Sequence, residues 1–360
     1  MILTKSCFIK NIKDSQALED LFLIKEMTRA ETRAGKPYIK LVVMDSTGEI
    51  SGNIWEEADR YNEEFKPGQV IRLNGQAQAY RGILQLKINR IQAVAESEVD
   101  RSLFLPTAPV APDAMTEELL RLIMGIKDKH LKKLVLAFFT DLKFVELFKN
   151  APAAKQMHHA YHGGLLEHTL AVANLANLVA GLYPVVDHSL LMAGAILHDL
   201  GKIKEYSFNS YPFDYTDDGR LMGHAVMAVE MIQEKIATIQ QFPGQRATSL
   251  KHLILSHHGR HEFGAPVVPM MLEAFILHFV DDLDAKINTI TKISEKAGVP
   301  GYQWTEYQRA LERFLYVAGP DNQTEAAEPE IHTDGTTKAR QSQDDVRQRL
   351  LFDSGKPFTE

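Results

Sequence analysis

Apolar and polar residues alternate along residues 20–94, with the period of two that is typical of strands with one buried face. The alternation is clear over residues 38–44, 49–55, 69–77 and 83–91 and weaker over residues 21–27, and turn formers such as Gly48 and Gly68 separate the segments. A short polar helix is expected at residues 56–64. The pattern predicts a five-stranded Greek-key barrel, with an open meander as the alternative.

The pattern changes after residue 113. From residue 116 to residue 318 apolar positions recur three and four residues apart, which predicts seven to nine helices and no strands. Three prolines and little periodicity over residues 98–113 are typical of a surface linker, and acidic residues outnumber basic ones after Gly319, which indicates a disordered tail. We expect a multidomain α and β protein: a barrel at residues 1–98, a linker at 99–113, an all-α domain at 114–318 and a tail at 319–360.

The composition of the 360 residues, 45% hydrophobic and 24% charged, is that of a globular protein with more than one core. Unbroken apolar runs fall short of the ~20 residues that cross a bilayer, and the first residues lack the apolar stretch of a signal peptide. We therefore expect no membrane contact and a cytoplasmic location. The net charge of −7 argues against a protein that grips nucleic acid by overall positive charge, but it allows a local groove.

Cysteine usage limits the metal chemistry. Because Cys7 is the one cysteine, an internal disulfide and a multi-thiolate zinc site are both excluded. Any metal would have to be held by imidazole and carboxylate groups, and the chain has 14 histidines.

Five segments of the expected helical domain place histidine or aspartate at the beginning or end of a helix, or within an apolar helix. In one segment, an apolar helix is expected to end at His198 and Asp199. Gly201 is expected to stop this helix, and Lys202 follows it. The candidate donors are His168, His198, Asp199, His224, His257, His258 and Asp281.

Taken singly, each of these histidines is more often a core residue with one hydrogen bond, or an exposed cap, than a metal ligand. Together, imidazoles and carboxylates without thiolates match a site for one or two divalent ions of the Mn, Fe, Co or Zn kind. Asp199 is the natural bridging carboxylate, because it follows His198 and one turn can present a donor to each ion. Lys202 either belongs to this site or is a surface lysine after a helix end.

The order of His168, the pair His198-Asp199 and Asp281 resembles that of the HD-domain superfamily of metal-dependent phosphohydrolases. His224 and the pair His257-His258 look like its two-metal branch, and Lys202 stands at the lysine of that branch's His-Asp-x-Gly-Lys motif. The motif does not choose a substrate, since similar HD sites serve nucleotidases, dinucleotide hydrolases and cyclic-dinucleotide phosphodiesterases.

The arrangement of the whole chain narrows the resemblance. Residues 36–41, 45–50 and 53–55 resemble the first strands of an oligonucleotide-binding (OB) domain, and residues 158–161, 215–224 and 255–259 resemble the YhaM family of bacterial 3′-to-5′ exoribonucleases. The resemblance covers about residues 5–315. It implies removal of nucleotides from the 3′ end of single-stranded RNA, with DNA as an open alternative, supported by manganese or cobalt, while iron, zinc and magnesium stay open.

The resemblance also implies roles for single residues. One ion would be held by His168, His198, Asp199 and Asp281, and a second by Asp199, His224, His257 and, as an open point, His258, with the two ions sharing an activated water. Lys202 would neutralise the phosphate as charge builds. The resemblance favours Asp281 as the metal ligand over Asp282 and Asp284. His278 is expected to support the ligands or the core and not to bind metal itself. The candidate substrate contacts are His158, His159, His162 and His261. Of these, His162 departs from the family, in which an apolar residue is common at this position.

Binding of single strands by the barrel would need aromatic faces for bases and cations for phosphates. Tyr38 and Lys40 share strand parity and thus a face. Tyr38 and Trp55 could equally be barrel core. The candidate residues are Arg33, Lys36, Tyr38, Lys40, Trp55, Tyr80, Arg81 and Lys87.

A weaker signal lies in the tail, where Gln348 to Phe352 resemble the short peptide by which bacterial proteins dock on the DNA sliding clamp. A disordered tether with an apolar anchor could bind a groove in this way. The alternative is that these residues fold back on their own domain. A homo-oligomer is a further expectation.

Two other functions stay open. The same HD chemistry could act on a small nucleotide, such as a cyclic dinucleotide or a dinucleoside polyphosphate, although no Gly-Tyr-Pro motif of the cyclic-di-GMP branch follows His258. Alternatively, the protein could bind nucleic acid without catalysis and use a structural metal, which the complete donor set and Lys202 argue against.

Overall fold

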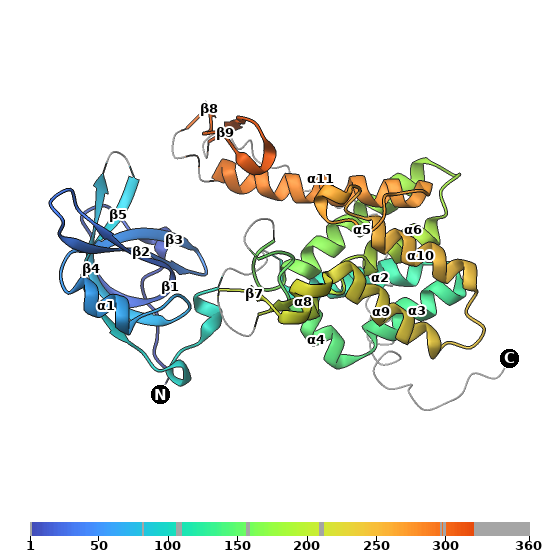
Figure 1. Cartoon of the computed structure of the whole chain (residues 1–360), viewed down its shortest axis with the longest axis horizontal. Helices are drawn as coiled ribbons and strands as arrows, with labels where there is room; N and C mark the ends of the chain where they lie inside the picture. The colour runs from blue at the N-terminus through green and yellow to red at the C-terminus, as the bar shows by residue number, and fades with distance from the viewer. Residues whose placement is uncertain are drawn as a thin grey trace, which may run out of the picture. The chain divides into compact units, whose positions relative to one another are not determined.

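A computed structural model describes residues 2–80, 83–105, 110–155, 159–208, 212–295, 297 and 300–319. The chain divides into two units, Met1–Thr289 and Ile290–Glu360. Within the first unit a β-barrel, blue to cyan in Figure 1, is followed along the chain by a helical domain.

Five strands close into a barrel in the order β1-β2-β3-β5-β4, with β4 paired back to β1. Along β2, Ile39, Leu41 and Val43 are buried and alternate with more exposed side chains, as the pleat of a half-buried strand requires. The closed barrel confirms the predicted fold class and excludes the open meander. The elements are β1 (Ala17–Glu31), β2 (Pro37–Asp45), β3 (Gly48–Ile54), α1 (Ala58–Glu64), β4 (Val70–Tyr80) and β5 (Ile83–Ala93), with short 3₁₀ helices at Ile9–Asn11, Glu96–Glu98 and Arg101–Leu103.

The first strand is buried on both faces. Phe22 and Ile24 lie inside the barrel core, whereas Leu21 and Leu23 belong to a second cluster with Phe104. Phe104 is fully buried, and the Ser46 amide donates to the Leu103 carbonyl at 3.0 Å. The expectation of a surface linker from residue 99 was therefore wrong for residues 99–105, which pack against the barrel.

The first helix of the helical domain begins at Pro112, two residues before the predicted boundary at residue 114, and proline is favourable at the start of a helix. The described residues contain ten α-helices here, more than the seven to nine expected, because α7 and α8 have four and six residues. The bounds are α2 (Pro112–Gly125), α3 (Lys129–Phe139), α4 (Leu142–Asn150), α5 (Gly164–Leu182), α6 (His188–Leu197), α7 (Lys202–Glu205), α8 (Asp217–Met222), α9 (His224–Ala237), α10 (Gly244–Ser256) and α11 (Leu272–Glu295).

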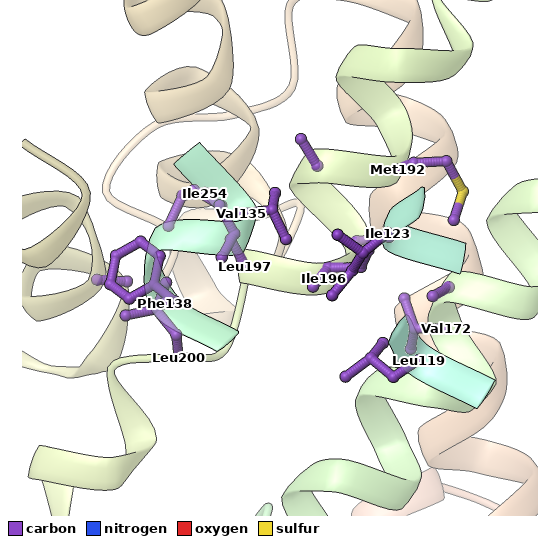
Figure 2. Close-up of a cluster of buried hydrophobic side chains, with 14 of the residues drawn as sticks. Leu119, Ile123, Val135, Phe138, Val172, Met192, Ile196, Leu197, Leu200 and Ile254 are labelled. Carbon is purple, nitrogen blue, oxygen red and sulfur yellow. The ribbon is translucent and has the colours of Figure 1, made fainter. Parts of the chain in front are cut away.

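One apolar core holds these helices together. Figure 2 shows part of it, in which Ile123 of α2, Val135 of α3, Val172 of α5 and Ile196 of α6 pack with neighbours from the same helices and α10. Helix α6 is apolar on every side, so its residues from Ser189 to Leu197 are all buried. The end of α6 therefore lies in the middle of the domain.

Helix α5 has the length and overall composition of a membrane-crossing helix, although its apolar run is interrupted, and half of its most apolar window is buried. Its side chains Leu165, Val172 and Ala176 belong to the core of the helical domain. Packing against α4 and α6 thus accounts for its apolar character.

Two short strand pairs contradict the expectation of no strands after residue 116. In the first unit, β6 (Tyr206–Ser207) pairs with β7 (Asp214–Tyr215). In the second unit, β8 (Tyr302–Trp304) pairs with β9 (Tyr316–Ala318). Elements of two or three residues are too short to show a period of their own in the sequence.

Candidate metal centre

Four helix ends and one helix interior bring the seven predicted donors together in the helical domain. The turn after α6 supplies two of them, the turn after α10 supplies two more, and α9 begins with another. Because α6 is buried along its length, its last turn delivers its donors to the interior. The seven are His168 on α5, His198 and Asp199 after α6, His224 on α9, His257 and His258 after α10, and Asp281 on α11.

The first group of donors surrounds His168. Its Nε2 atom lies 3.2 Å from Nε2 of His198, 3.1 Å from Oδ1 of Asp281 and 3.3 Å from Oδ2 of Asp199. His198 Nε2 is also 3.3 Å from the same Asp199 oxygen. We call His168, His198 and Asp281 the His168 group.

The second group of donors surrounds His224. Its Nε2 atom lies 3.4 Å from Nε2 of His257 and 3.2 Å from Nε2 of His258. The other oxygen of Asp199, Oδ1, is 3.4 Å from His224 Nε2 and 3.7 Å from His257 Nε2. We call these three histidines the His224 group. Asp199 thus presents one oxygen to each group.

The donor atoms fit divalent ions. Ligands at about 2.1 Å from one ion at tetrahedral or octahedral angles lie about 3.0 to 3.4 Å apart, which is the range seen within both groups. Both oxygens of Asp199 are buried and lack a hydrogen bond of normal geometry among the described residues. Lys202 lies beside Oδ2 of Asp199, but facing imidazole lone pairs next to this buried carboxylate are costly unless a cation lies between them.

The other ring nitrogen of most of these histidines is held by an acceptor. His198 and His257 donate from Nδ1 to the carbonyls of Ala195 and Ile254, at 2.9 and 2.6 Å. His224 donates from Nδ1 to Glu205, at 3.0 Å. These bonds fix the tautomer in which Nε2 carries the lone pair toward the centre, as metal-binding histidines require.

His168 is held by a carboxylate of α11. Its Nδ1 atom donates to Oδ2 of Asp284 at 2.6 Å, whereas Asp281, three residues earlier, faces the donor atoms. Asp282 lies on the outside and pairs with Lys286. The geometry therefore separates the three aspartates: Asp281 is placed for ligation, Asp284 behind His168, and Asp282 away from the centre.

The electrostatics keep Asp199, His257 and His258 in the forms that bind cations, whereas the carboxylates around His168 favour its protonated ring. Burial alone would raise the pKa of Asp199, but Lys202 and His198 hold the pKa well below its usual value, so the carboxylate is ionised. Burial lowers the pKa of His258 to about 4 and that of His257 well below its usual value, so both rings are neutral. Burial would also lower the pKa of His168, but Asp199, Asp281 and Asp284 raise it well above its usual value.

Lys202 is not a surface lysine. It is 7% exposed, and its Nζ atom lies 2.6 Å from Oδ2 of Asp199. Burial disfavours its charge, but Asp199 raises its pKa, so the ammonium group stays charged beside the bridging carboxylate.

The candidate substrate contacts fall in different places. His159 is 3% exposed and contacts Asp284, so it lies behind the donors and a direct substrate contact is not supported. His162 donates to the Asn150 carbonyl at 2.9 Å and packs edge-on against Phe213. His261 is exposed and donates to the Ala265 carbonyl. His158 lies outside the described residues.

His278 lies behind the ligands, as expected. Its Nδ1 atom donates to the carbonyl of His257 at 2.9 Å. Sequence patterns gave no indication of Glu205, which holds His224, or of the contacts of Tyr161 and Glu167 with His159. Each of these is set by tertiary geometry between separate segments.

The barrel carries four of its candidate residues on an outer face: Tyr38, Lys40, Trp55 and Lys87. Tyr38 and Trp55 stack with ring centroids 4.7 Å apart, and Trp55 is 41% exposed, so the alternative that they form barrel core was wrong. Lys40 pairs with Asn53, and Asn53 pairs with Lys87, which puts both lysines in one row across β2, β3 and β5. Both lysines are exposed.

The remaining barrel candidates lie around this face or away from it. Lys36 and Trp55 line a depression of about 360 Å³ next to α1, which Glu56 and Asp59 also line. Arg33 is exposed in the turn between β1 and β2, and Tyr80 is 58% exposed at the end of β4. Arg81 lies outside the described residues.

A closed OB-type barrel and a buried His/Asp centre in a helical domain define a class: HD-domain, metal-dependent phosphohydrolases joined to an OB-fold domain. Sequence models described as HD domain and as OB-fold nucleic acid binding domain match residues 165–286 and 23–94. A helicase-family model also matches residues 110–183, within the same helical domain. The HD match implies dependence on a divalent metal.

Relatives of known activity narrow the class. The chain is 37% identical over 299 residues to the 3′-5′ exoribonuclease YhaM of Bacillus subtilis, covering 82% of this chain and 93% of that protein. It is 39% identical over 276 residues to YhaM of Listeria monocytogenes, covering 76% and 87%. The chain belongs to the YhaM family. Among solved structures, the second OB-fold domain of replication protein A from Methanococcus maripaludis matches 24% of the chain at 17% identity, with a TM-score of 0.21.

Proposed function

We propose that this protein is a metal-dependent 3′-5′ exonuclease that hydrolyses single-stranded RNA. The observation that carries the proposal is Asp199, a buried carboxylate with one oxygen 3.3 Å from donors of the His168 group and the other 3.4 Å from His224. A carboxylate that faces both groups would help to hold a pair of ions that act on one phosphodiester. Manganese or cobalt is the proposed metal, because imidazole and carboxylate donors suit both and the family resemblance favours them.

The residues of the centre have separate tasks in this proposal. When bound, divalent ions supply Lewis acidity and activate a water for attack on the phosphodiester. Asp199 would offer one oxygen to each ion, and the Nδ1 hydrogen bonds hold the imidazoles of His198, His224 and His257 in one orientation. Lys202 offers a positive charge next to Asp199, where charge on the phosphoryl group would build in the transition state.

The barrel is the proposed guide for the strand. Half-buried Tyr38 and exposed Trp55 offer ring faces for bases, and Lys40 and Lys87 offer cations for phosphates on the same outer surface of β2, β3 and β5. DNA would be bound by the same features, because stacking and charge do not depend on the 2′-hydroxyl.

Three other predictions from the sequence stay predictions. They are a cytoplasmic location, self-association, and a sliding-clamp contact through Gln348 to Phe352, which lie outside the described residues.

The test uses the full chain with a 5′-labelled single-stranded oligonucleotide, as RNA and as DNA, in Mn²⁺, Co²⁺, Mg²⁺ or chelator. We expect RNA to shorten step by step from its 3′ end in Mn²⁺ or Co²⁺ and to stay intact in chelator. Asp199→Asn and Asp281→Asn should lower the cleavage rate by more than about 100-fold, since loss of a metal ligand costs more activity than loss of a residue that only orients a ligand. Asp282→Asn is the matched control, because Asp282 pairs with Lys286 outside the centre, and its rate should stay within about twofold.

The second candidate function is hydrolysis of small nucleotides by the same centre. Intact RNA together with metal-dependent cleavage of a cyclic dinucleotide or a dinucleoside polyphosphate would replace the exonuclease proposal. Strand binding that survives chelator without any product would instead indicate a binding protein.

A further inference from the structure

The donor histidines are held in place in different ways. His198 and His257 donate to carbonyls three residues earlier in their own helices, so the backbone fixes those rings. His168 donates instead to the Asp284 side chain, which belongs to a different helix. A carboxylate can orient His168 only if something else holds the carboxylate.

His159 holds that carboxylate. Oδ2 of Asp284 accepts from His168 at 2.6 Å and from Nε2 of His159 at 3.0 Å. On its other side, Nδ1 of His159 contacts the Tyr161 hydroxyl at 3.0 Å and Oε2 of Glu167 at 3.1 Å. His159 is therefore a buried link between two carboxylates, one of which fixes a predicted metal ligand.

The backbone at His159 is strained and tightly held. Its φ of 46° lies in the left-handed region, which costs a residue other than glycine about 1 to 3 kcal/mol. Its amide donates to the side chain of Asn288 on α11 at 3.0 Å, and its carbonyl accepts from the amides of Ala153 and Tyr161. A Cβ atom at Gly164 would lie 2.0 Å from that carbonyl oxygen, so the start of α5 presses against it.

Strain of this kind persists where the surroundings fix it, and it gathers at functional sites. Here it brings the His159 ring between α5, which carries His168, and α11, which carries Asp284. The His224 group has a different support, Glu205 of α7, and this second support has no link to His159 among the described contacts.

We propose that His159 is a positioning residue for one half of the metal centre: it holds Asp284, which orients His168 and sets the affinity of the His168 group for its ion. The inference rests on the proposed function, since it takes the two groups as two metal sites. It predicts an asymmetry. Loss of the His159 side chain weakens one metal-binding step and leaves the other unchanged.

The variant is His159→Asn, because asparagine tolerates the left-handed backbone while the ring that reaches both carboxylates is removed. Metal-free full-length protein is titrated with Mn²⁺ alone by calorimetry. Wild-type protein should show two binding steps, and the variant should weaken one of them by about 10- to 100-fold, as changes behind a ligand do. Asp281→Asn identifies the affected step, because Asp281 belongs to the His168 group. His188→Asn is the matched control, since His188 bonds to Asn177 outside the centre.

Three results would overturn the inference. In the first, both Mn²⁺-binding steps of His159→Asn are unchanged, and in the second, both steps are weakened equally. In the third, the melting temperature of the variant in chelator is so low that the whole domain is affected. A second measurement separates positioning from catalysis: in His159→Asn the metal concentration for half-maximal RNA cleavage should rise, and the rate at saturating Mn²⁺ should return to within about threefold of wild type. If wild-type protein binds no Mn²⁺ at all, the proposed function itself fails. The wild-type titration alone gives that result, so it is distinguished from a failure of the inference about His159.

Discussion

Single residues of the centre are explained partly by their chemistry and partly by the space around them. Gly201 was expected to stop α6 through its conformational freedom, but its φ of −63° is one that any residue adopts. The structure gives another reason for glycine. A Cβ atom at this position would lie 2.1 Å from the carbonyl oxygen of His224 and 3.0 Å from the amide nitrogen of Ala228. Glycine lets the turn that carries Asp199 approach the start of α9.

Gly201→Ala should therefore separate Asp199 from His224. Because the close contact is with backbone, we expect a loss of about 1 to 3 kcal/mol in the free energy of unfolding, measured in urea, together with weaker Mn²⁺ binding. Gly181→Ala is the control: a Cβ there meets nothing within 4 Å among the described residues, and alanine in this helix should stabilise by up to about 1 kcal/mol. Wild-type stability and metal affinity in Gly201→Ala would refute this account of the glycine.

The seven donors could be found from the sequence because they carry a local signal, such as the adjacent pairs His198-Asp199 and His257-His258. The residues behind them carry none. Glu205 resembles an exposed helical glutamate in the sequence, and its contact with His224 arises only where α7 and α9 meet. His159 lies in an irregular segment, and its partner Asp284 is 125 residues away in the chain.

At the scale of elements, the strands were predicted where one face is buried and were hardest to predict where both are. β1 gave the weakest pattern because Leu21 and Leu23 pack outside the barrel while Phe22 and Ile24 pack inside it. Burial on both faces removes the alternation on which the prediction depends. The packing of residues 99–105 against the barrel could not be predicted for a related reason, since it depends on partners distant in the sequence and not on local periodicity.

The outer face of β2 and β3 leads to a prediction about strand binding. Trp55→Ala should weaken binding of a long single-stranded RNA by about 1 to 3 kcal/mol, or roughly 5- to 150-fold, if a base stacks on the ring. Because Tyr38 and Trp55 stack on each other, the losses in Tyr38→Ala and Trp55→Ala should not add in the double variant. Binding is measured by fluorescence anisotropy in an Asp199→Asn background with chelator, so that no cleavage occurs.

Two controls make this measurement specific to the barrel. Tyr183→Ala removes a comparably exposed aromatic residue from the helical domain and should leave affinity unchanged. In the Asp199-containing protein, Trp55→Ala should leave the cleavage of a dinucleotide unaffected, since so short a substrate needs only the centre. Unchanged affinity in both barrel variants would mean that the aromatic pair does not bind the strand.

At the scale of the molecule, the chain has separate apolar cores for its barrel and its helical domain. The barrel clusters draw on residues up to Leu105, and the helical core begins at Met115. The described metal donors all lie in the helical domain. Ion binding should therefore stabilise one core and not the other.

Removal of metal tests this division. Binding to the folded state stabilises by about 2.7 kcal/mol when free ion is 100 times the dissociation constant, which for a domain of this size raises the melting temperature by about 5 to 10 °C. We expect calorimetry of the full chain to show two transitions, of which one moves by this amount between Mn²⁺ and chelator. The other should stay fixed, and it should coincide with the melting of a fragment of residues 1–105. A fragment of residues 1–98 should melt lower, because it leaves Leu21 and Leu23 without Phe104. Movement of both transitions with metal would show that the two cores unfold as one cooperative unit.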